Sequence, residues 1–554
     1  MGPPDSKPTP NHGTENFFVK NSAWLLLVLV VVATLLRLPL LDRSIWYDEA
    51  CMSSQRIGST PQLLATLYTD IQPPLFAVFM HLWYLLFGDG EVVMRLPAMI
   101  SGILCIPLTY WVGYRLIGRA PALMAAALLT LSPVHVWYST EARLYAPMIL
   151  TTLFAFGCID RLTDQQRGPR PWLFWSHLLN LVVMLSLHYY LAVLVVALAG
   201  LAPILMRGMT ERARSLVMWH GIGILGLAGY VMAKLQLGEF ETSQDYLRTL
   251  NGRELFRFLF EWSWSGNTMQ ASDASLMRGL ATGFVWFGVG LTVLGVIRLV
   301  VHARRKPRAL LVPTGVAVLP CFLFACVYAG YNNTYLERSL IPALPFLFLL
   351  AAAGLQVFPG KLRIVAGGTV LTLAATALIN LYASYDTKWT IYMPHPDWRS
   401  AARYLSNEIQ TGASGTPVFT SMPNPRSLSY YDVRIQDAKN LKVELSPGDI
   451  GNKVRERLGD WLGDFAESSF SEFAAYNQAM YAGAELLVYR CKSTPAELPR
   501  MASRTDATCY LVRNKWHPHR SVDGSVEALL AHPRTEVLHT ERCTGVTVYK
   551  VRFK

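Results

Sequence analysis

Residues 21–50 read NSAWLLLVLVVVATLLRLPLLDRSIWYDEA, an apolar run that ends in a pair of acidic residues. The run from 21 to 41 is long enough for a membrane-spanning helix, which needs about 20 predominantly apolar residues. Asp48 and Glu49 follow it at the membrane boundary, where carboxylates are costly unless they meet water, a cation or a reacting group. A second acidic stretch, YSTEARLY at 138–145, lies between two later apolar runs. Both stretches indicate chemistry at the face of a membrane.

The composition of the chain favours a membrane domain followed by a soluble domain. Of its 554 residues, 52% are hydrophobic and 16% are charged, whereas about 25% charged residues is usual for soluble proteins. Long apolar runs continue to about residue 384, and the remainder of the chain is polar. We therefore predict a disordered cytoplasmic tail (1–20), a transmembrane domain (21–384) and a soluble domain (385–554).

The soluble domain is predicted to mix helices and strands. A helix start is indicated by PDWRSAARYL at 396–405, with Asp397 as its N-cap. The segments ELLVY at 485–489 and VTVYKV at 546–551 are rich in residues that favour strands. An α/β fold is therefore expected after residue 385.

The net charge of +12 does not indicate a nucleic-acid-binding protein, because the basic residues form no single patch. They gather in short loops between apolar runs, which is the pattern of cytoplasmic loops in membrane proteins. The strongest of these loops is HARRKPR at 302–308. The other loops contain Arg115 and Arg119; Arg161, Arg167 and Arg170; Arg207, Arg212 and Arg214; and Lys361 and Arg363.

About eleven apolar runs are candidates for spanning helices, and one further run, 74–88, is too short to span and fits an interfacial helix better. If 74–88 did span, Asp48 and Glu141 would lie on opposite faces. An interfacial helix instead places the N-terminus and every basic loop in the cytoplasm, and both acidic stretches and the soluble domain outside. The spanning candidates are 21–41, 95–117, 121–138, 143–160, 171–187, 189–206, 215–235, 278–301, 309–329, 338–358 and 362–384.

Short motifs follow one another in a characteristic order. They are WYDEA at 46–50, QPPL at 72–75, RLP at 95–97 and YSTEARLY at 138–145, with weaker ones at 337–342 (ERSLIP) and 397–399 (DWR). In this order the chain resembles the bacterial branch of the dolichyl-phosphate-mannose-protein mannosyltransferase superfamily, which has the GT-C fold. The aminoarabinose transferase that modifies lipid A is a more distant member. The resemblance therefore implies a polytopic α-helical membrane protein with a GT-C-like fold.

The resemblance also implies an enzyme that takes a sugar from a polyprenyl-phosphate donor. Its acceptor would be a lipid, a glycan or a protein on the outer face of the bacterial inner membrane. Asp48 matches the family's acid in the first external loop, where it would be the general base, since an acceptor hydroxyl needs a positioned carboxylate to take its proton. The departing phosphate needs nearby cations instead of a general acid. A single displacement at the anomeric carbon would invert its configuration.

The acidic residues have alternative interpretations. Asp48 could instead be an N-cap of the helix that follows. Glu49 is a candidate catalytic residue that orients Asp48, binds a cation or pairs with a base such as Arg43. Glu141 matches the second acidic position of the family, where relatives often carry Asp, and would contact the acceptor or a metal. Its alternatives are an ion pair with Arg143 and a helix-start acid that interacts with the helix dipole.

Four residues are candidates for substrate binding. Arg143 and Arg338 would bind the lipid phosphate, to which guanidinium groups are well suited, and Tyr145 would line the pocket. His81, on the interfacial run, is a candidate substrate contact. The alternative for Arg338 is a membrane anchor that reaches the lipid headgroups. The alternative for Tyr145 is an interfacial aromatic position. The segment 188–190 resembles a family segment, but an aromatic belt at the membrane interface is favoured for it.

The sequence defines no metal site, because it shows no His and Asp ligand set and its eight cysteines lack metal-site spacing. A divalent cation as cofactor stays an open alternative. The three cysteines of the soluble domain, Cys491, Cys509 and Cys543, allow at most one disulfide. A lipid or saccharide transporter is the competing function. Transporters keep ionisable residues near the bilayer midplane on broken helices, whereas the acids here gather at one face, which favours an enzyme.

Overall fold

The computed structural model describes most of the membrane domain and the centre of the soluble domain. The tail at 1–20, which is predicted to be disordered, and Cys491 lie outside the described residues. The described residues are 21–53, 57–70, 72–166, 168, 170–237, 249–266, 275–331, 334–382, 396–414, 416, 418–420, 426–432, 434–437, 452, 467–468, 471, 484, 486–490, 508–514, 526, 529–533 and 535–553.

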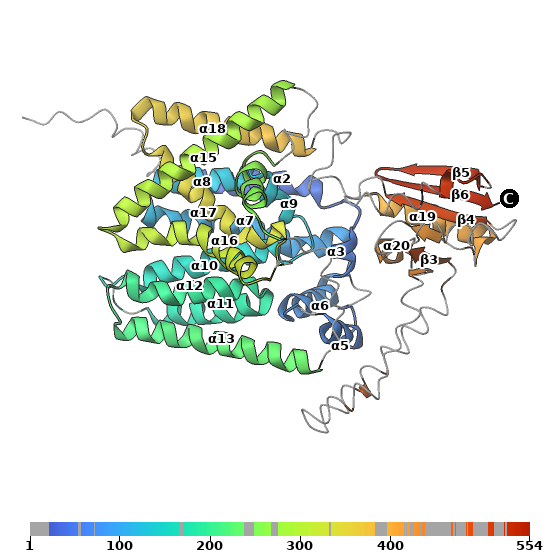
Figure 1. Cartoon of the computed structure of the whole chain (residues 1–554), viewed down its shortest axis with the longest axis horizontal. Helices are drawn as coiled ribbons and strands as arrows, with labels where there is room; N and C mark the ends of the chain where they lie inside the picture. Colours follow the sequence, from blue (N-terminus) through green and yellow to red (C-terminus); the bar gives the residue numbers. More distant parts are fainter. Residues whose placement is uncertain are drawn as a thin grey trace, which may run out of the picture.

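Long apolar helices form a bundle, and the soluble domain lies beyond one end of it (Figure 1). Every run that the sequence predicts as a span contains helix among its described residues, and in the described part of the chain seven helical segments are long and apolar enough to cross a membrane. The helices of the bundle are α2 (Ser22–Arg37), α7 (Glu91–Leu116), α8 (Arg119–Leu131), α9 (Pro133–Tyr138), α10 (Tyr145–Leu162), α11 (Pro171–Leu187), α12 (Tyr190–Leu205), α13 (Glu211–Leu237), α15 (Ser275–Ala303), α16 (Leu311–Tyr328), α17 (Leu344–Leu355) and α18 (Gly360–Tyr382).

Shorter turns and helices connect these elements. They are η1 (Leu38–Leu40), α14 (Gly252–Phe256), η2 (Arg257–Ser265), η3 (Pro307–Leu310) and η4 (Glu337–Ala343).

Helix α17 lies at the centre of the bundle, because 94% of the residues in the apolar stretch of Glu337–Leu355 are buried. It approaches α15 closely through small residues. Gly354 of α17 lies against the backbone carbonyl of Leu291, and Gly295 of α15 lies against that of Leu350. A side chain at either glycine would collide with the opposite backbone, so this contact depends on small residues, as is common between membrane helices.

The segment that carries the first acidic motif lies at the end of the bundle nearest the soluble domain. It contains α3 (Tyr47–Ala50), α5 (Thr60–Thr69) and α6 (Leu75–Phe87). Arg399 of the soluble domain contacts both Asp42, before this segment, and Glu91, after it. The chain therefore enters and leaves the segment at the same end of the bundle. This arrangement agrees with an interfacial helix at 74–88, which stays a prediction.

The soluble domain has a mixed sheet with a helix packed against it. In the described residues the sheet has six strands in the order β2-β3-β1-β4-β6-β5, with β2, β3, β1 and β4 parallel and β5, β6 and β4 antiparallel. Trp398 and Leu405 of α19 pack on Val418, Tyr510 and Val548 of the sheet. The elements are α19 (Trp398–Glu408), η5 (Ile409–Ala413), α20 (Arg426–Tyr431), β1 (Val418–Thr420), β2 (Ile435–Asp437), β3 (Leu486–Arg490), β4 (Thr508–Asn514), β5 (Thr535–Cys543) and β6 (Val546–Phe553).

Two predictions for this domain are confirmed. The side chain of Asp397 accepts a hydrogen bond from the backbone N–H of Ser400 at 3.0 Å, as an N-cap does. Strands β3 and β6 lie where the strand-forming segments predict them. Cys509 and Cys543, which the sequence offers as disulfide partners, are not joined to each other.

Candidate active site

Three segments that are far apart in the sequence meet at the end of the bundle nearest the soluble domain. They are helix α3 with Asp48, the turn between α9 and α10 with Glu141 and Arg143, and η4 with Arg338. Tyr145 begins α10 and joins them. With Glu49, which follows Asp48 and bonds Ala142, the structure thus brings together six of the seven residues that the sequence singles out.

Helix α3 is a single turn that presents Asp48 in its first turn. The N-cap of α3 is Trp46, whose backbone is extended, and Asp48 lies two residues later. The alternative in which Asp48 is the N-cap is therefore wrong. An acid in the first turn of a helix is still favoured by the helix dipole, so the local sequence and the position of Asp48 agree.

Asp48 forms an ion pair with Arg338. Oδ2 of Asp48 lies 2.8 Å from Nη1 of Arg338. The geometry of this contact is not that of a hydrogen bond, and Oδ2 has no hydrogen-bond partner among the described residues. The guanidinium carbon of Arg338 also lies 5.5 Å from the centre of the Tyr145 ring and 5.9 Å from that of Trp46. The ion pair thus holds Asp48 beside a cation.

Arg143 and Glu141 each keep a buried polar atom that has no hydrogen bond within the described part of the chain. Arg143 donates from Nη1 to the backbone carbonyl of Asp48 at 3.4 Å, but its Nε has no partner. Oε2 of Glu141 is likewise buried without one. Buried polar atoms are rarely left unsatisfied, because each costs about 1–3 kcal/mol. Both side chains therefore keep a polar atom with which a polar ligand could bond.

Glu141 lies outside the helices, in the turn before α10, and is almost fully buried. Burial, together with the nearby carboxylate of Glu49, raises the pKa of Glu141 to about 8, although Arg43 and Arg338 oppose the shift. Glu141 is therefore mainly neutral at pH 7. A neutral acid can donate a hydrogen bond, which a carboxylate cannot.

The raised pKa of Glu141 predicts a specific dependence of stability on pH. The folded protein holds this proton up to about pH 8, whereas the carboxyl group in the unfolded chain releases it near its ordinary pKa of 4.5. The stability of the wild type should therefore fall, relative to Glu141→Gln, as the pH rises from about 4.5 to about 8, and then level off. Thermal unfolding of both proteins in detergent at pH 5 and pH 8.5 measures this difference. Equal pH dependence in the two proteins would contradict the assignment.

Glu49 forms a buried ion pair with Arg95 of α7. Both side chains are completely buried, and the contacts are 2.7 Å from Nε to Oε1 and 2.5 Å from Nη2 to Oε2. Oε1 of Glu49 also accepts the backbone N–H of Ala142 at 2.9 Å. Glu49 therefore links the first acidic motif to the second through Arg95 and Ala142. Because its oxygens are engaged, we assign it a positioning role.

Arg43, which the sequence offers as a partner for Glu49, bridges the two motifs in another way. Its guanidinium carbon lies 4.1 Å from the centre of the Trp137 ring, and Nη2 donates to Oγ1 of Thr140 at 2.9 Å. Arg43 is therefore held on the segment that precedes Glu141. It adds a positive charge to the same region.

Arg37 also fixes the second motif, and its role is not predicted from the sequence. It lies at the end of α2, is fully buried, and donates from Nε to Oγ of Ser139 at 2.7 Å and from Nη1 to the carbonyl of Ala33 at 2.7 Å. An arginine inside an apolar run is costly and usually functional or structural. That signal is present in the sequence, within the run 21–41.

His188 is a further residue near the site. It lies between α11 and α12, and burial together with the guanidinium groups of Arg143 and Arg338 lowers its pKa to about 4. His188 is therefore neutral at pH 7 and close to both arginines. The sequence favours an aromatic membrane belt for 188–190, and this proximity was not predicted.

His81 lies outside the cluster. It is buried on α6, and its Nδ1 is 2.5 Å from the backbone carbonyl of Ile57. This contact packs α6 against the chain that follows α3. Nothing in the described contacts of His81 connects it to Asp48, Arg143 or Arg338.

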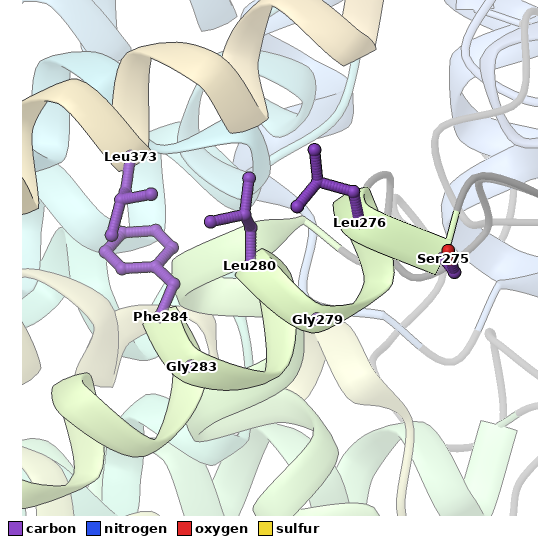
Figure 2. A pocket seen from close by; sticks show the side chains of 7 residues that line it. All are labelled: Ser275, Leu276, Gly279, Leu280, Gly283, Phe284 and Leu373. Carbon is purple, nitrogen blue, oxygen red and sulfur yellow. The ribbon is translucent and has the colours of Figure 1, made fainter.

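No group of three or more His, Cys, Asp or Glu side chains that could hold a metal occurs within the described part of the chain. An open apolar groove lies elsewhere, along α15 and α18 (Figure 2). Leu276, Leu280, Phe284 and Leu373 line it, and Ser275 supplies its only polar side chain among the described residues. Among the described residues, the groove therefore offers no acid, base or cation, in contrast to the cluster around Asp48.

Comparisons with known proteins agree with the fold. Residues 71–232 match the family model of the dolichyl-phosphate-mannose-protein mannosyltransferases. The whole chain is similar to crystal structures of ArnT from Cupriavidus metallidurans. The apo structure shares 13% identity with a TM-score of 0.54, and the structure bound to undecaprenyl phosphate shares 14% with a TM-score of 0.51; each match covers 96% of this chain and 98% of the other. No curated protein matches the sequence significantly. The chain therefore has the GT-C fold of a polytopic membrane protein, and its residues 71–232 are similar to the dolichyl-phosphate-mannose-protein mannosyltransferases.

Proposed function

We propose that the protein transfers a sugar from a polyprenyl-phosphate donor to an acceptor on the outer face of the membrane, with Asp48 as general base. The observation that carries this proposal is the convergence of Asp48 with Arg143 and Arg338. A carboxylate that can accept a proton thus lies beside two guanidinium groups that can hold a phosphate. The transfer needs both functions within the length of one glycosyl phosphate.

The charge of the site favours a phosphate ligand. When Glu141 is neutral and Glu49 is paired with Arg95, the guanidinium groups of Arg43, Arg143 and Arg338 outnumber the single carboxylate of Asp48 in this region. A guanidinium group can bind two phosphate oxygens at once, and it is always charged. The similar ArnT structure contains undecaprenyl phosphate, which supports a polyprenyl phosphate as the carrier in this chain.

The reaction follows from this arrangement. Asp48 takes the proton of an acceptor hydroxyl, whose oxygen attacks the anomeric carbon while the bond from that carbon to the phosphate breaks. Arg143 and Arg338 stabilise the negative charge that remains on the departing polyprenyl phosphate. Since attack and departure occur on opposite sides of the carbon, the sugar is transferred with inversion. Glu141 donates a hydrogen bond to the donor or the acceptor.

The proposed orientation puts the acidic cluster and the soluble domain outside the cytoplasm. Arg115 and Arg308 meet Asp160 and Asp164 at the opposite end of the bundle from Asp48, with contacts of 2.6 Å and 3.0 Å to Asp164. Excess positive charge marks the cytoplasmic side of membrane proteins. We therefore place the N-terminus in the cytoplasm of a bacterial cell, the catalytic domain at 21–384 in the inner membrane, and the domain at 385–554 outside.

Replacing Arg143 or Arg338 by alanine should weaken binding of the carrier phosphate. Loss of a charge-assisted contact costs about 1.5–3 kcal/mol, so the affinity for undecaprenyl phosphate should fall about 10- to 100-fold. Native mass spectrometry of the purified proteins titrated with undecaprenyl phosphate measures this change. Arg119→Ala, which removes an exposed arginine at the start of α8, is the matched control and should bind as the wild type does. If both site variants bind as tightly as the control, the phosphate site lies elsewhere.

A further inference from the structure

The soluble domain is bonded directly to the chain that leads into Asp48. Tyr431, the last residue of α20, accepts a hydrogen bond from the backbone N–H of Ile45 at 2.8 Å. Its hydroxyl also lies 3.1 Å from Oγ of Ser44 and donates to the carboxylate of Glu91. One phenol hydroxyl thus joins the soluble domain to the first external loop and to α7. Figure 1 shows the soluble domain beside the end of the bundle that carries α3.

The same loop is held from its other side by Arg95. Nη1 of Arg95 donates to the backbone carbonyls of Leu41 and Arg43, at 2.6 Å each, and Nη2 lies 3.3 Å from the carbonyl of Ser44. Arg95 lies one helical turn after Glu91 on α7. Helix α7 therefore binds the loop through Arg95 and binds Tyr431 through Glu91. The loop therefore has bonds to the membrane domain through its carbonyls and to the soluble domain through the N–H of Ile45.

The surroundings of Tyr431 suit this bridging role. Its ring packs against the hydrophobic core of the membrane domain and against that of the soluble domain. Burial raises the pKa of Tyr431, so the hydroxyl stays protonated and can donate to Glu91. Its oxygen is then left with two lone pairs, which match the two groups supplied by Ile45 and Ser44.

A second residue of the soluble domain supports the same contact. Arg399, in the first turn of α19, pairs with Asp42 at 2.8 Å and with the carboxylate of Glu91. Its backbone N–H lies 3.3 Å from Oγ of Ser44. Glu91 therefore receives Tyr431 and Arg399 together, and the loop is held at Asp42, Ser44 and Ile45.

We infer that Tyr431 is a positioning residue for the proposed reaction, through which the soluble domain fixes Asp48 for catalysis. Ile45, to which Tyr431 is bonded, directly precedes Trp46, the N-cap of α3. The position of Asp48 therefore depends on where the bond to Tyr431 holds Ile45. A misplacement of about 1 Å can cost about 10²-fold in rate. This inference rests on the proposed function for its kinetic part, and on the contacts of Tyr431 for its structural part.

Tyr431→Phe tests the inference, because it removes the hydroxyl and keeps the ring. Tyr430→Phe is the matched control, since the hydroxyl of Tyr430 bonds the backbone carbonyl of Asp89 at 2.8 Å and lies outside the loop at 41–45. Hydrogen–deuterium exchange of the full-length protein in detergent should show faster exchange across residues 42–50 in Tyr431→Phe, on the order of tenfold at Ile45. Turnover should fall at least about tenfold in Tyr431→Phe, with unchanged affinity for undecaprenyl phosphate, while Tyr430→Phe behaves as the wild type.

The exchange experiment needs no transfer activity, so it separates failure of this inference from failure of the proposed function. Unchanged exchange at 42–50 in Tyr431→Phe overturns the inference whether or not the wild type transfers sugar. Faster exchange with full turnover overturns it too, because the loop would then be held without effect on Asp48. Faster exchange with a lower kcat and unchanged carrier affinity supports it. If the wild type itself transfers no sugar, faster exchange confined to Tyr431→Phe still supports the structural link, and only the proposed function fails.

Discussion

Asp48→Asn should abolish sugar transfer while leaving the fold and the binding of the carrier lipid intact. The amide keeps the size of the carboxylate but cannot take a proton from the acceptor hydroxyl. Loss of a general base typically lowers the rate by about 10²–10⁴. The ion pair with Arg338 at 2.8 Å is also lost, so Arg338 becomes free to bind phosphate, and carrier affinity should not fall. Turnover is measured with membranes that contain either protein, and carrier affinity by native mass spectrometry with undecaprenyl phosphate.

The matched control is Glu211→Gln, which neutralises an exposed acid at the start of α13. It should transfer sugar at the rate of the wild type. Near-normal turnover in Asp48→Asn would remove Asp48 from the mechanism. The base would then have to be Glu49 or Glu141, although Glu49 is paired with Arg95 and Glu141 is mainly protonated at pH 7.

Arg95→Met should destabilise the protein severely. The change removes the partner of Glu49 and leaves a buried carboxylate without a compensating charge, which costs about 3–5 kcal/mol. It also removes the donors to the carbonyls of Leu41 and Arg43. Thermal unfolding in detergent should therefore show a markedly lower midpoint, and transfer should be lost because the loop before Asp48 is released.

The double variant Glu49→Gln with Arg95→Met separates charge burial from simple loss of packing. With both charges gone, no isolated ion is buried, so part of the lost stability should return. The double variant should therefore unfold at a higher temperature than Arg95→Met alone. An equal or lower midpoint would mean that the ion pair between Glu49 and Arg95 contributes little.

The sequence predicts the helices well because membrane spans obey a simple constraint. The bilayer fixes their length and composition, so runs such as 275–303 and 360–382 are evident in the sequence without knowledge of tertiary contacts. The short run at 74–88 is predicted to be interfacial, since it is shorter than a span and the basic loops disagree with a crossing. The helix that begins after Asp397 and the strands β3 and β6 follow from equally local signals.

The residues of the candidate site are predicted from the sequence more successfully than the residues with which they form ion pairs and hydrogen bonds. Asp48, Arg143 and Arg338 belong to motifs whose order carries the family resemblance, and the structure brings them together. Which base pairs with Glu49 depends on packing between α3 and α7, so the sequence offers Arg43 where the structure has Arg95. His81 resembles an exposed interfacial residue, but the packing of α6 buries it.

Contacts between domains are the hardest to predict from one sequence. Ile45 and Tyr431 are 386 residues apart, and neither belongs to a motif with a chemical signature. Their hydrogen bond depends on how the soluble domain docks on the membrane domain. That docking is decided by shape and by many weak contacts, which leave no periodic signal in the sequence.

The central claim is that the protein uses a polyprenyl-phosphate sugar as donor, with Asp48 as the general base. It is tested most directly by mass spectrometry of polyprenyl lipids in isolated membranes that carry the wild type or Asp48→Asn. The membranes are incubated with no nucleotide sugar, so that no new donor forms. A polyprenyl-phosphate-linked sugar should disappear, and free polyprenyl phosphate should rise, only in membranes with the wild type. The mass of the lost species would identify the sugar. If every polyprenyl-phosphate-linked sugar persists equally in both membranes, the claim is wrong.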